Sequence, residues 1–152
     1  MTEPKFAPKS GQVDYSSARY SPVVNAVVSK DDKILLVKRS PKMRFYPSYW
    51  NGISGFLDDD LDIAQKVIQE LAEELGLNKS DILEIKKGTV FLQEAADYKK
   101  TWIVVPVLVR IKTGKFQLNS EASEANWFTP GEIGKLKLVP GFERVVGQFF
   151  ST

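Results

Sequence analysis

The chain has 152 residues, of which 43% are hydrophobic and 26% are charged, the balance of one globular domain with enough apolar residues for a core. Its formal net charge of +2 does not favour nucleic acid as a partner. The sequence contains neither Cys nor His, which excludes disulfides, thiolate nucleophiles, imidazole bases and metal sites built from these residues. If the protein is an enzyme, its chemistry falls to carboxylates, Lys, Arg, Tyr, hydroxyl groups and a hard cation.

The first part of the chain, residues 1–19, is a polar lead-in that contains Pro and Ser, and it precedes a single domain over residues 20–152. The lead-in lacks the apolar core of a signal peptide. The longest apolar run, residues 102–109, is far shorter than the roughly 20 residues of a membrane span. We therefore expect a cytoplasmic protein that does not bind membranes.

The domain begins with a predicted β-hairpin and continues into a helix. Residues 22–28 and 33–38 are rich in Val, Ile and Leu, and they flank the polar turn 29–32. Residues 39–54 contain prolines and aromatic residues without a sustained period, which is typical of a loop. Residues 62–75 have helical periodicity, and Gly76 follows where a C-cap glycine belongs.

The second half of the domain alternates predicted strands with a helix. We expect two long strands at 82–93 and 101–111, joined by the polar turn 94–100, and a short strand at 125–128. A helix start is predicted at 130–133 and a closing helix at 141–150. Strands interleaved with two helices on a mixed sheet predict an α/β sandwich.

The helix at 62–75 carries an acidic cluster beside its apolar stripe. The cluster is Glu70, Glu73 and Glu74, spaced i, i+3 and i+4, in the last turns, where the helix dipole disfavours negative charge. Of the neighbouring cations only Lys66 is within reach of Glu70. A divalent cation would relieve this repulsion, and oxygen-only ligands favour Mg²⁺ or Mn²⁺. The alternative is a solvated acidic face. The apolar stripe consists of Ala64, Val67, Ile68, Leu71, Ala72 and Leu75.

Residues 55–77 resemble the Nudix box, Gly-x5-Glu-x7-Arg-Glu-U-x-Glu-Glu-x-Gly-U, in which U is a bulky aliphatic residue. The segment 35–40 is similar to the second strand of the same family. The segment 121–133 is similar to a late Glu-x-x-Glu-x-x-Trp-Phe strand that leads into a helix. The resemblance implies a Nudix-like α/β/α sandwich with a mixed β-sheet. The residues on the box pattern are Gly55, Glu70, Leu71, Glu73, Glu74, Gly76 and Leu77.

Two positions depart from the box. Leu61 stands where the first Glu is expected, and Gln69 stands where Arg is expected. In the family this pair is thought to orient the metal-binding carboxylates, and Asp58, Asp60 or Asp62 could supply part of the missing acid. Two hypotheses therefore stay open: an active hydrolase, or a catalytically impaired Nudix-like domain that binds a nucleotide or a protein partner.

The resemblance implies hydrolysis of the diphosphate linkage in a small-molecule nucleoside diphosphate derivative, with Mg²⁺ or Mn²⁺ as cofactor. It assigns the metal to Glu70, Glu73 and Glu74 and to a backbone carbonyl near Ser54. Glu121 is expected to complete the catalytic set, because its spacing to Trp127 matches the late-strand acid of the family. Glu94 is the reserve candidate for that role, and it is also predicted to be a substrate-binding residue.

The segment after residue 37 carries four cations in seven residues, Lys38, Arg39, Lys42 and Arg44. Arg39 stands where the family resemblance implies a phosphate-contacting Arg, and its planar guanidinium suits bidentate contact. A basic solvated loop is the alternative, and it is the reading favoured for the other three. Tyr46 and Trp50 offer faces on which a base could stack, although packing is the alternative for these aromatic residues. No signature in the sequence names the substrate. Many members of the family are homodimers, but the sequence defines no interface for one.

Overall fold

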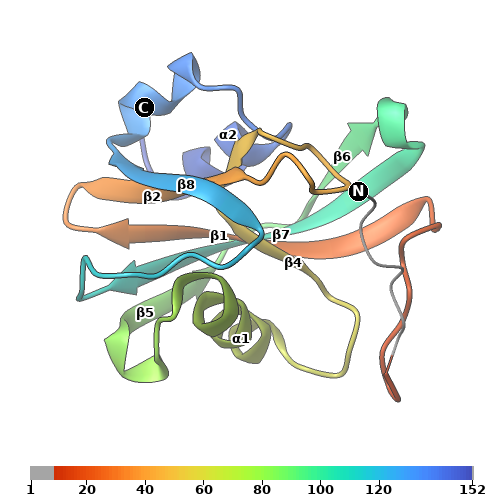
Figure 1. Ribbon diagram of the computed structural model, residues 1–152, viewed down its shortest axis with the longest axis horizontal. Coiled ribbons are helices and arrows are strands. Elements are labelled where there is room, and N and C mark those ends of the chain that lie inside the picture. The colour runs from red at the N-terminus through yellow and green to blue at the C-terminus, as the bar shows by residue number, and fades with distance from the viewer. Residues whose placement is uncertain (1–8, 152) are drawn as a thin grey trace.

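The computed structural model of the protein describes residues 9–151; the part of the lead-in at 1–8, and residue 152, lie outside the described residues. A mixed β-sheet forms the centre of the molecule, with the longer helix on one face and the C-terminal helix on the other (Figure 1). This arrangement confirms the α/β/α sandwich. No helix in the described part of the chain is long and apolar enough to cross a membrane.

The helices and strands follow the predicted order. The strands are β1 (Tyr20–Lys30), β2 (Lys33–Arg39), β3 (Trp50–Asn51), β4 (Ile53–Phe56), β5 (Ile82–Lys87), β6 (Phe91–Ala95), β7 (Lys100–Ile111) and β8 (Ala122–Phe128). The α-helices are α1 (Ile63–Leu75) and α2 (Phe142–Gly147). Three short 3-10 helices are η1 (Lys79–Asp81), η2 (Ala96–Tyr98) and η3 (Pro130–Lys135).

Strand β1 organises the sheet because it pairs with three other strands. It runs parallel to β7, from the Tyr20–Thr101 pair to the Ser29–Arg110 pair. It is antiparallel to β2 near the hairpin turn and to β4 further toward its N-terminus. On the far side of β2 lie β3 and β8, and β5 and β6 pair with the outer edge of β7. The strand end that carries Ser54 and Gly55 is thereby placed against the middle of the sheet.

Successive residues of β1 supply the two halves of the core. Val24, Ala26 and Val28 pack on the α1 side, together with Val67 and Leu71 of the helix. Val27 points to the opposite face and packs with α2, whose Phe142, Val145 and Val146 are all buried. A strand that is buried on both faces has a nearly continuous run of apolar residues. This explains why residues 22–28 are readily predicted as a strand from the sequence.

Helix α1 begins and ends where the sequence predicts. Asp62 is the N-cap: it accepts a hydrogen bond from the Gln65 backbone N–H at 2.8 Å, and Gln65 Oε1 accepts one from the Asp62 backbone N–H at 3.0 Å. Gly76 ends the helix in the left-handed region, with φ 65°. The predicted buried stripe is partly wrong, because Ala64 and Ala72 are exposed and Lys66 is buried. The inward face is rotated toward the side that carries Glu70 and Glu74.

Two predicted boundaries are corrected by the pairing of the sheet. The predicted loop 39–54 contains β3 and the start of β4, two strands too short to show a period of their own. The predicted strand 82–93 is interrupted at residues 88–90, which divides it into β5 and β6. The interruption lies opposite Pro106 of β7, which has no N–H to donate to the ladder but accepts a hydrogen bond from the Gly88 N–H at 2.8 Å.

The C-terminal predictions also need adjustment. Residues 130–135 form a 3-10 helix, and the predicted helix 141–150 is shorter, covering Phe142–Gly147. The predicted strand 125–128 is longer and begins at Ala122.

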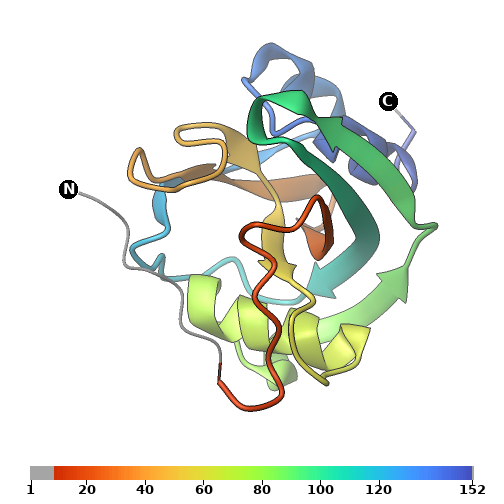
Figure 2. The ribbon, with the colours of Figure 1, turned by 90° about the vertical axis from the view of Figure 1, so that its right-hand side faces the viewer.

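The described part of the lead-in, residues 9–19, packs along the domain beside α1 and the loop before it (Figure 2). Its end is fixed by Lys100, whose buried ammonium donates to the carbonyls of Tyr15 (2.7 Å) and Ala18 (2.6 Å) and to Ser21 Oγ (2.9 Å). The Tyr15 ring stacks on Phe56. The lead-in therefore contributes to the surface around the site.

Candidate active site

A cavity of about 580 Å³ opens between α1, the end of β2, β4 and the loop after β2. One end is acidic and is lined by Glu70, Glu73, Glu74 and Glu121. The other end is formed by aromatic rings and amides: Asn25, Phe45, Tyr46, Asn51, Phe56 and Trp102. A volume of this size suits a small molecule rather than a single ion.

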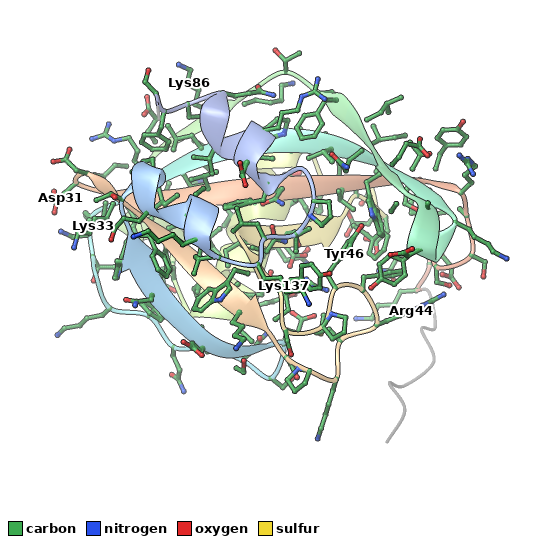
Figure 3. The ribbon with its side chains drawn as sticks, turned by 90° about the horizontal axis from the view of Figure 1, so that it is seen from above. Asp31, Lys33, Arg44, Tyr46, Lys86 and Lys137 are labelled. Atoms are coloured by element: carbon green, nitrogen blue, oxygen red, sulfur yellow. The ribbon has the colours of Figure 1, made fainter. Side chains whose placement is uncertain are left out.

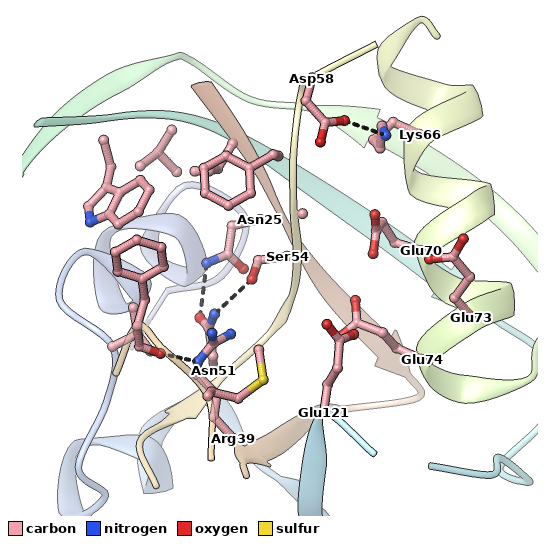
Figure 4. Close-up of a pocket in the computed structure, with 18 of the residues that line it drawn as sticks. Asn25, Arg39, Asn51, Ser54, Asp58, Lys66, Glu70, Glu73, Glu74 and Glu121 are labelled. Atoms are coloured by element: carbon pink, nitrogen blue, oxygen red, sulfur yellow. Dashed lines mark hydrogen bonds and ion pairs between the residues drawn. The ribbon is translucent and has the colours of Figure 1, made fainter. Parts of the chain in front are cut away.

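The acidic end is built from α1 and from the segment that leads into β8 (Figure 4). Glu70, Glu73 and Glu74 come from successive turns of the helix, and the side chains of Glu74 and Glu121 converge at this end of the cavity. The Glu121 backbone is held in place because its carbonyl accepts from the Ser40 N–H at 2.8 Å and its N–H donates to Asn119 Oδ1 at 3.0 Å. The structure thus brings the four predicted catalytic carboxylates to one wall.

Two glutamates of the acidic wall, Glu70 and Glu74, have raised pKa values, so their charged forms are disfavoured. Burial, opposed by a hydrogen bond with Glu74 and strengthened by the charges of Glu73 and Glu121, raises the pKa of Glu70 from 4.5 to about 7. Burial and the charges of Glu70 and Glu121 raise the pKa of Glu74 well above its ordinary value. Within the described residues, Glu74 Oε2 is buried without a hydrogen-bond partner. An uncompensated acceptor of this kind fits a cation.

Strand β4 forms the wall opposite the helix. Gly55 lies directly against Glu70, since a Cβ at this position would be 2.4 Å from Glu70 Oε1. Ser54 precedes it and accepts a hydrogen bond at its Oγ from Asn51 Nδ2 at 3.2 Å. Among the described residues no three acidic side chains are already gathered at metal-binding distances. The donor set of carboxylates, with an unpaired Glu74 oxygen among them, is nevertheless one that Mg²⁺ or Mn²⁺ accepts.

Arg39 is a cation of the cavity wall whose charge acts on the acidic end. It is partly buried, its Nε donates to the carbonyl of Phe45 at 2.8 Å, and its charge lowers the pKa of Glu74, against the larger effects of burial and neighbouring acids. Arg44 instead contacts the lead-in, donating to the Ser16 carbonyl at 3.1 Å, and lies over the Phe45 ring. Figure 3 shows Arg44 and Tyr46 on the loop after β2, far from the β1–β2 turn marked by Asp31 and Lys33.

The aromatic end contains Tyr46 as predicted, together with residues that the sequence analysis did not select. The Tyr46 hydroxyl accepts from Trp102 Nε1 at 3.0 Å, and its burial raises its pKa. Asn25 donates from Nδ2 to Asn51 Oδ1 at 2.9 Å, and its own Oδ1 is buried without a partner among the described residues. Asn25 could have been selected from the sequence, because it is the one polar residue in the apolar run 22–28 of β1.

Two predicted substrate-binding residues lie elsewhere. Trp50 is buried in the core on the α2 side, where its ring meets Phe128 edge to face, and it is not part of the cavity wall. Glu94 is exposed; it pairs with Arg19 at 3.3 Å and accepts from Thr101 Oγ1 at 2.6 Å, outside the cavity. Neither side chain can contact a molecule in the cavity without rearrangement.

The acids expected to supply part of the missing box Glu lie in three different environments. Asp62 caps α1, Asp60 is exposed, and Asp58 forms an ion pair with Lys66 at 3.4 Å. Asp59, which the sequence analysis did not single out, binds the same ammonium at 2.8 Å. Lys66 therefore does not pair with Glu70, the partner that the sequence suggested.

Comparison with solved structures places the fold among known ones. The chain is similar to a MutT NUDIX hydrolase from Burkholderia pseudomallei, with a TM-score of 0.74 and 20% identity over 86% of this chain and 98% of that one. It is similar to the NUDIX domain of Shewanella oneidensis NrtR, complexed with ADP ribose, with a TM-score of 0.71 and 20% identity over 85% of each chain.

A third similar structure is the bifunctional NMN adenylyltransferase/ADP ribose pyrophosphatase from Francisella tularensis, complexed with AMP and a Mn ion. Its TM-score is 0.68 and its identity 23%, over 84% of this chain and 40% of that one. No functionally curated protein matches the sequence. A family model described as NUDIX domain matches residues 19–149, nearly the whole described chain. This match, together with the sandwich and the placement of the box helix, shows that the chain belongs to the Nudix family.

Proposed function

We propose that the protein hydrolyses the diphosphate linkage of a small nucleoside diphosphate derivative with the help of Mg²⁺ or Mn²⁺. The observation that carries this proposal is the polarity of the cavity, with four carboxylates at one end and aromatic rings with buried amides at the other. A nucleoside diphosphate has the matching polarity: charged phosphates, which need a cation beside carboxylates, and a flat base, which suits aromatic rings. The similar structures with ADP ribose and with AMP and Mn support the same class of ligand.

Glu70, Glu73 and Glu74, with the Ser54 carbonyl, are the residues that would hold the cation. When bound, the cation neutralises phosphate charge and lowers the pKa of water beside it. Arg39, which lines the cavity, would donate hydrogen bonds to phosphate oxygens. Asn25, Tyr46 and Trp102 would hold the nucleoside.

Glu121 is our candidate for the general base. The reaction forms a bond from a water oxygen to phosphorus and breaks the bond from that phosphorus to the bridging oxygen, so that two phosphate products leave. In a chain without His the proton of the water must pass to a carboxylate or to another oxygen base. Glu121 lies beside Glu74 but belongs to the segment before β8, so its position does not depend on the turns of α1 that carry the other three glutamates. Glu94 is not retained for this role, because it lies outside the cavity.

The proposal is tested by incubating the purified protein with ADP-ribose, nucleotide sugars, dinucleoside polyphosphates and nucleoside triphosphates, with and without Mn²⁺ or Mg²⁺, and separating the products. We expect turnover of at least one compound, only with metal. Glu74→Gln should reduce kcat by about 10²-fold or more, because an ion held by fewer carboxylates is misplaced. Glu143→Gln, which changes an exposed glutamate on α2, is the matched control.

The same experiment separates the alternative hypothesis. Nucleotide binding without turnover at any metal concentration would contradict the hydrolase and support the catalytically impaired binding domain. Equal loss of activity in the two Gln variants would contradict the assignment of the acidic wall.

A further inference from the structure

Lys66 is a buried cation whose donors are all engaged within the chain. The residue is 3% exposed, although it lies on a helix at the cavity wall. Its ammonium donates to Asp59 Oδ2 at 2.8 Å, to Gln69 Oε1 at 3.2 Å and to Asp58 Oδ1 at 3.4 Å. A lysine ammonium has three N–H donors, so none remains for a phosphate without breaking one of these bonds. The geometry therefore suits a role in holding the chain rather than the substrate.

The partners of Lys66 tie the loop before α1 to two other segments. Asp58 also accepts from Gln12 Nε2 at 3.0 Å through its second carboxylate oxygen, and its carbonyl accepts from the Val13 N–H at 2.6 Å. Asp59 accepts from the Leu61 N–H at 3.2 Å. The loop at 57–62 is thus fastened to α1 on one side and to the lead-in on the other.

The ion pair lies next to the contact that seats Glu70. Lys66 is one helical turn before Glu70, and Asp58 is three residues after Gly55. The pairs Lys66–Asp58 and Glu70–Gly55 are therefore consecutive contacts between the same two segments, α1 and the strand β4 with its continuation. Figure 4 shows the first of them, with Glu70 one turn further along the helix. If the first contact opens, the helix and strand can separate, and the Glu70 carboxylate loses the backbone against which it rests.

The two box positions that depart from the family pattern do not form this connection themselves. Leu61 is apolar, and the Gln69 oxygen is already occupied by Lys66. Among the described residues, the ionic contacts between α1 and the preceding loop are those of Lys66 with Asp58 and Asp59.

We propose that Lys66, together with Asp58 and Asp59, is a positioning clamp that sets the separation between α1 and β4 and so holds Glu70 against Gly55. The clamp itself is a property of the metal-free fold. Its effect on a cation rests on the proposed function, so the two are tested by separate measurements.

The variants are Lys66→Met, which keeps a long side chain but removes the charge, and Lys66→Arg, which keeps the charge. Lys112→Met, at an exposed lysine at the end of the sheet, is the matched control. Should Lys66→Met fail to fold, Asp59→Asn provides a milder change, because Asp59 has a side chain that is 24% exposed. Circular dichroism first establishes which variants are folded.

Hydrogen–deuterium exchange of the metal-free proteins tests the clamp. In Lys66→Met, or in Asp59→Asn, we expect faster exchange not only in the loop 57–62 but also in peptides covering β4 and residues 70–75, with wild-type rates in β7. Lys66→Arg and Lys112→Met should exchange like the wild type. Faster exchange confined to residues 57–66 would overturn the proposal, since the loss would not reach Glu70.

Mn²⁺ titration, followed by the rise in melting temperature, tests the consequence for the site. The Mn²⁺ concentration for half of the rise should increase about 10-fold or more in Lys66→Met, the size usual when a residue that orients a metal ligand is lost. The KM for the nucleotide at saturating Mn²⁺ should stay within about twofold. An unchanged Mn²⁺ response with a raised KM would overturn the clamp in favour of direct phosphate contact. A wild type that shows no Mn²⁺ response contradicts the proposed function instead, and the exchange data still decide the clamp.

Discussion

Glu70 depends on the residue across from it having no side chain. A Cβ on Gly55 would lie 2.4 Å from Glu70 Oε1 and 2.6 Å from Cδ, so even a methyl group would displace the carboxylate from the wall of the cavity. Gly55 does not have a positive φ, so the requirement comes from this close approach rather than from the backbone conformation. The first glycine of the box can therefore be understood from the packing of this chain alone.

We expect Gly55→Ala to fold and to lose hydrolytic activity by about 10²-fold, because a catalytic group displaced by about 1 Å costs a factor of that order. The measurement is kcat for the best substrate from the proposed screen, with circular dichroism as a check on folding. Gly134→Ala is the control, since a Cβ there meets no atom within 4 Å. A wild-type kcat in Gly55→Ala would show that the close contact between Glu70 and Gly55 is not needed for activity.

At the same scale, sequence reasoning found the acidic wall but not the residues around it. Glu70, Glu73 and Glu74 follow from spacing along one helix, and local spacing is what a sequence displays. Lys66 was considered only as a partner for Glu70, because its burial depends on Asp58 and Asp59 in a loop whose path the sequence does not define. Trp50 has the composition of a stacking residue, but its pairing with Lys38 and packing on Phe128 place it in the core.

At the scale of elements, α1 is the part of the fold that the sequence specifies most completely. Its N-cap, its capping box and its C-cap glycine all depend on residues within the helix or next to it. Strands β3 and β4 were missed because each exists through partners far along the chain. A two-residue strand such as β3 is stabilised by its pairing with β2 and by the bridge from Trp50 to Leu138.

The cap of α1 should contribute measurably to stability. Asp62→Ala removes the acceptor for the Gln65 N–H, which is expected to cost about 1 kcal/mol in the free energy of unfolding. For a domain of this size that corresponds to a fall in melting temperature of roughly 2–4 °C. Asp60→Ala, in the same loop and exposed, should leave the melting temperature unchanged. Equal effects of the two substitutions would contradict the cap's contribution.

At the scale of the whole molecule, the acidic wall makes the metal-free protein sensitive to pH. The folded state raises the pKa of Glu70 from 4.5 to about 7, so it binds this proton more tightly than the unfolded chain does. Stability from this group is therefore fully present below pH 4.5 and is lost as the pH rises through about 7. Glu74 acts in the same direction.

We expect the free energy of unfolding of the metal-free protein to fall, relative to the double variant Glu70→Gln/Glu74→Gln, by on the order of 3 kcal/mol between about pH 4 and pH 8. Urea denaturation at several pH values, with a chelator present, provides the measurement. Saturating Mn²⁺ at pH 8 should restore the loss in the wild type and not in the double variant. If the free energy of unfolding changed with pH in the same way in both proteins, ionisation of Glu70 and Glu74 would not destabilise the metal-free fold.

The parallel pairing of β1 with β7 also constrains how the protein is made. Ten residue pairs, from Tyr20 with Thr101 to Ser29 with Arg110, join segments from opposite halves of the polypeptide. A nascent chain on the ribosome cannot close its central sheet until residue 110 has left the exit tunnel. Until then one edge of β1 has no partner strand, and the apolar side chains that β7 adds to both halves of the core are missing. The apolar segments made first therefore stay partly exposed during most of the translation of this domain.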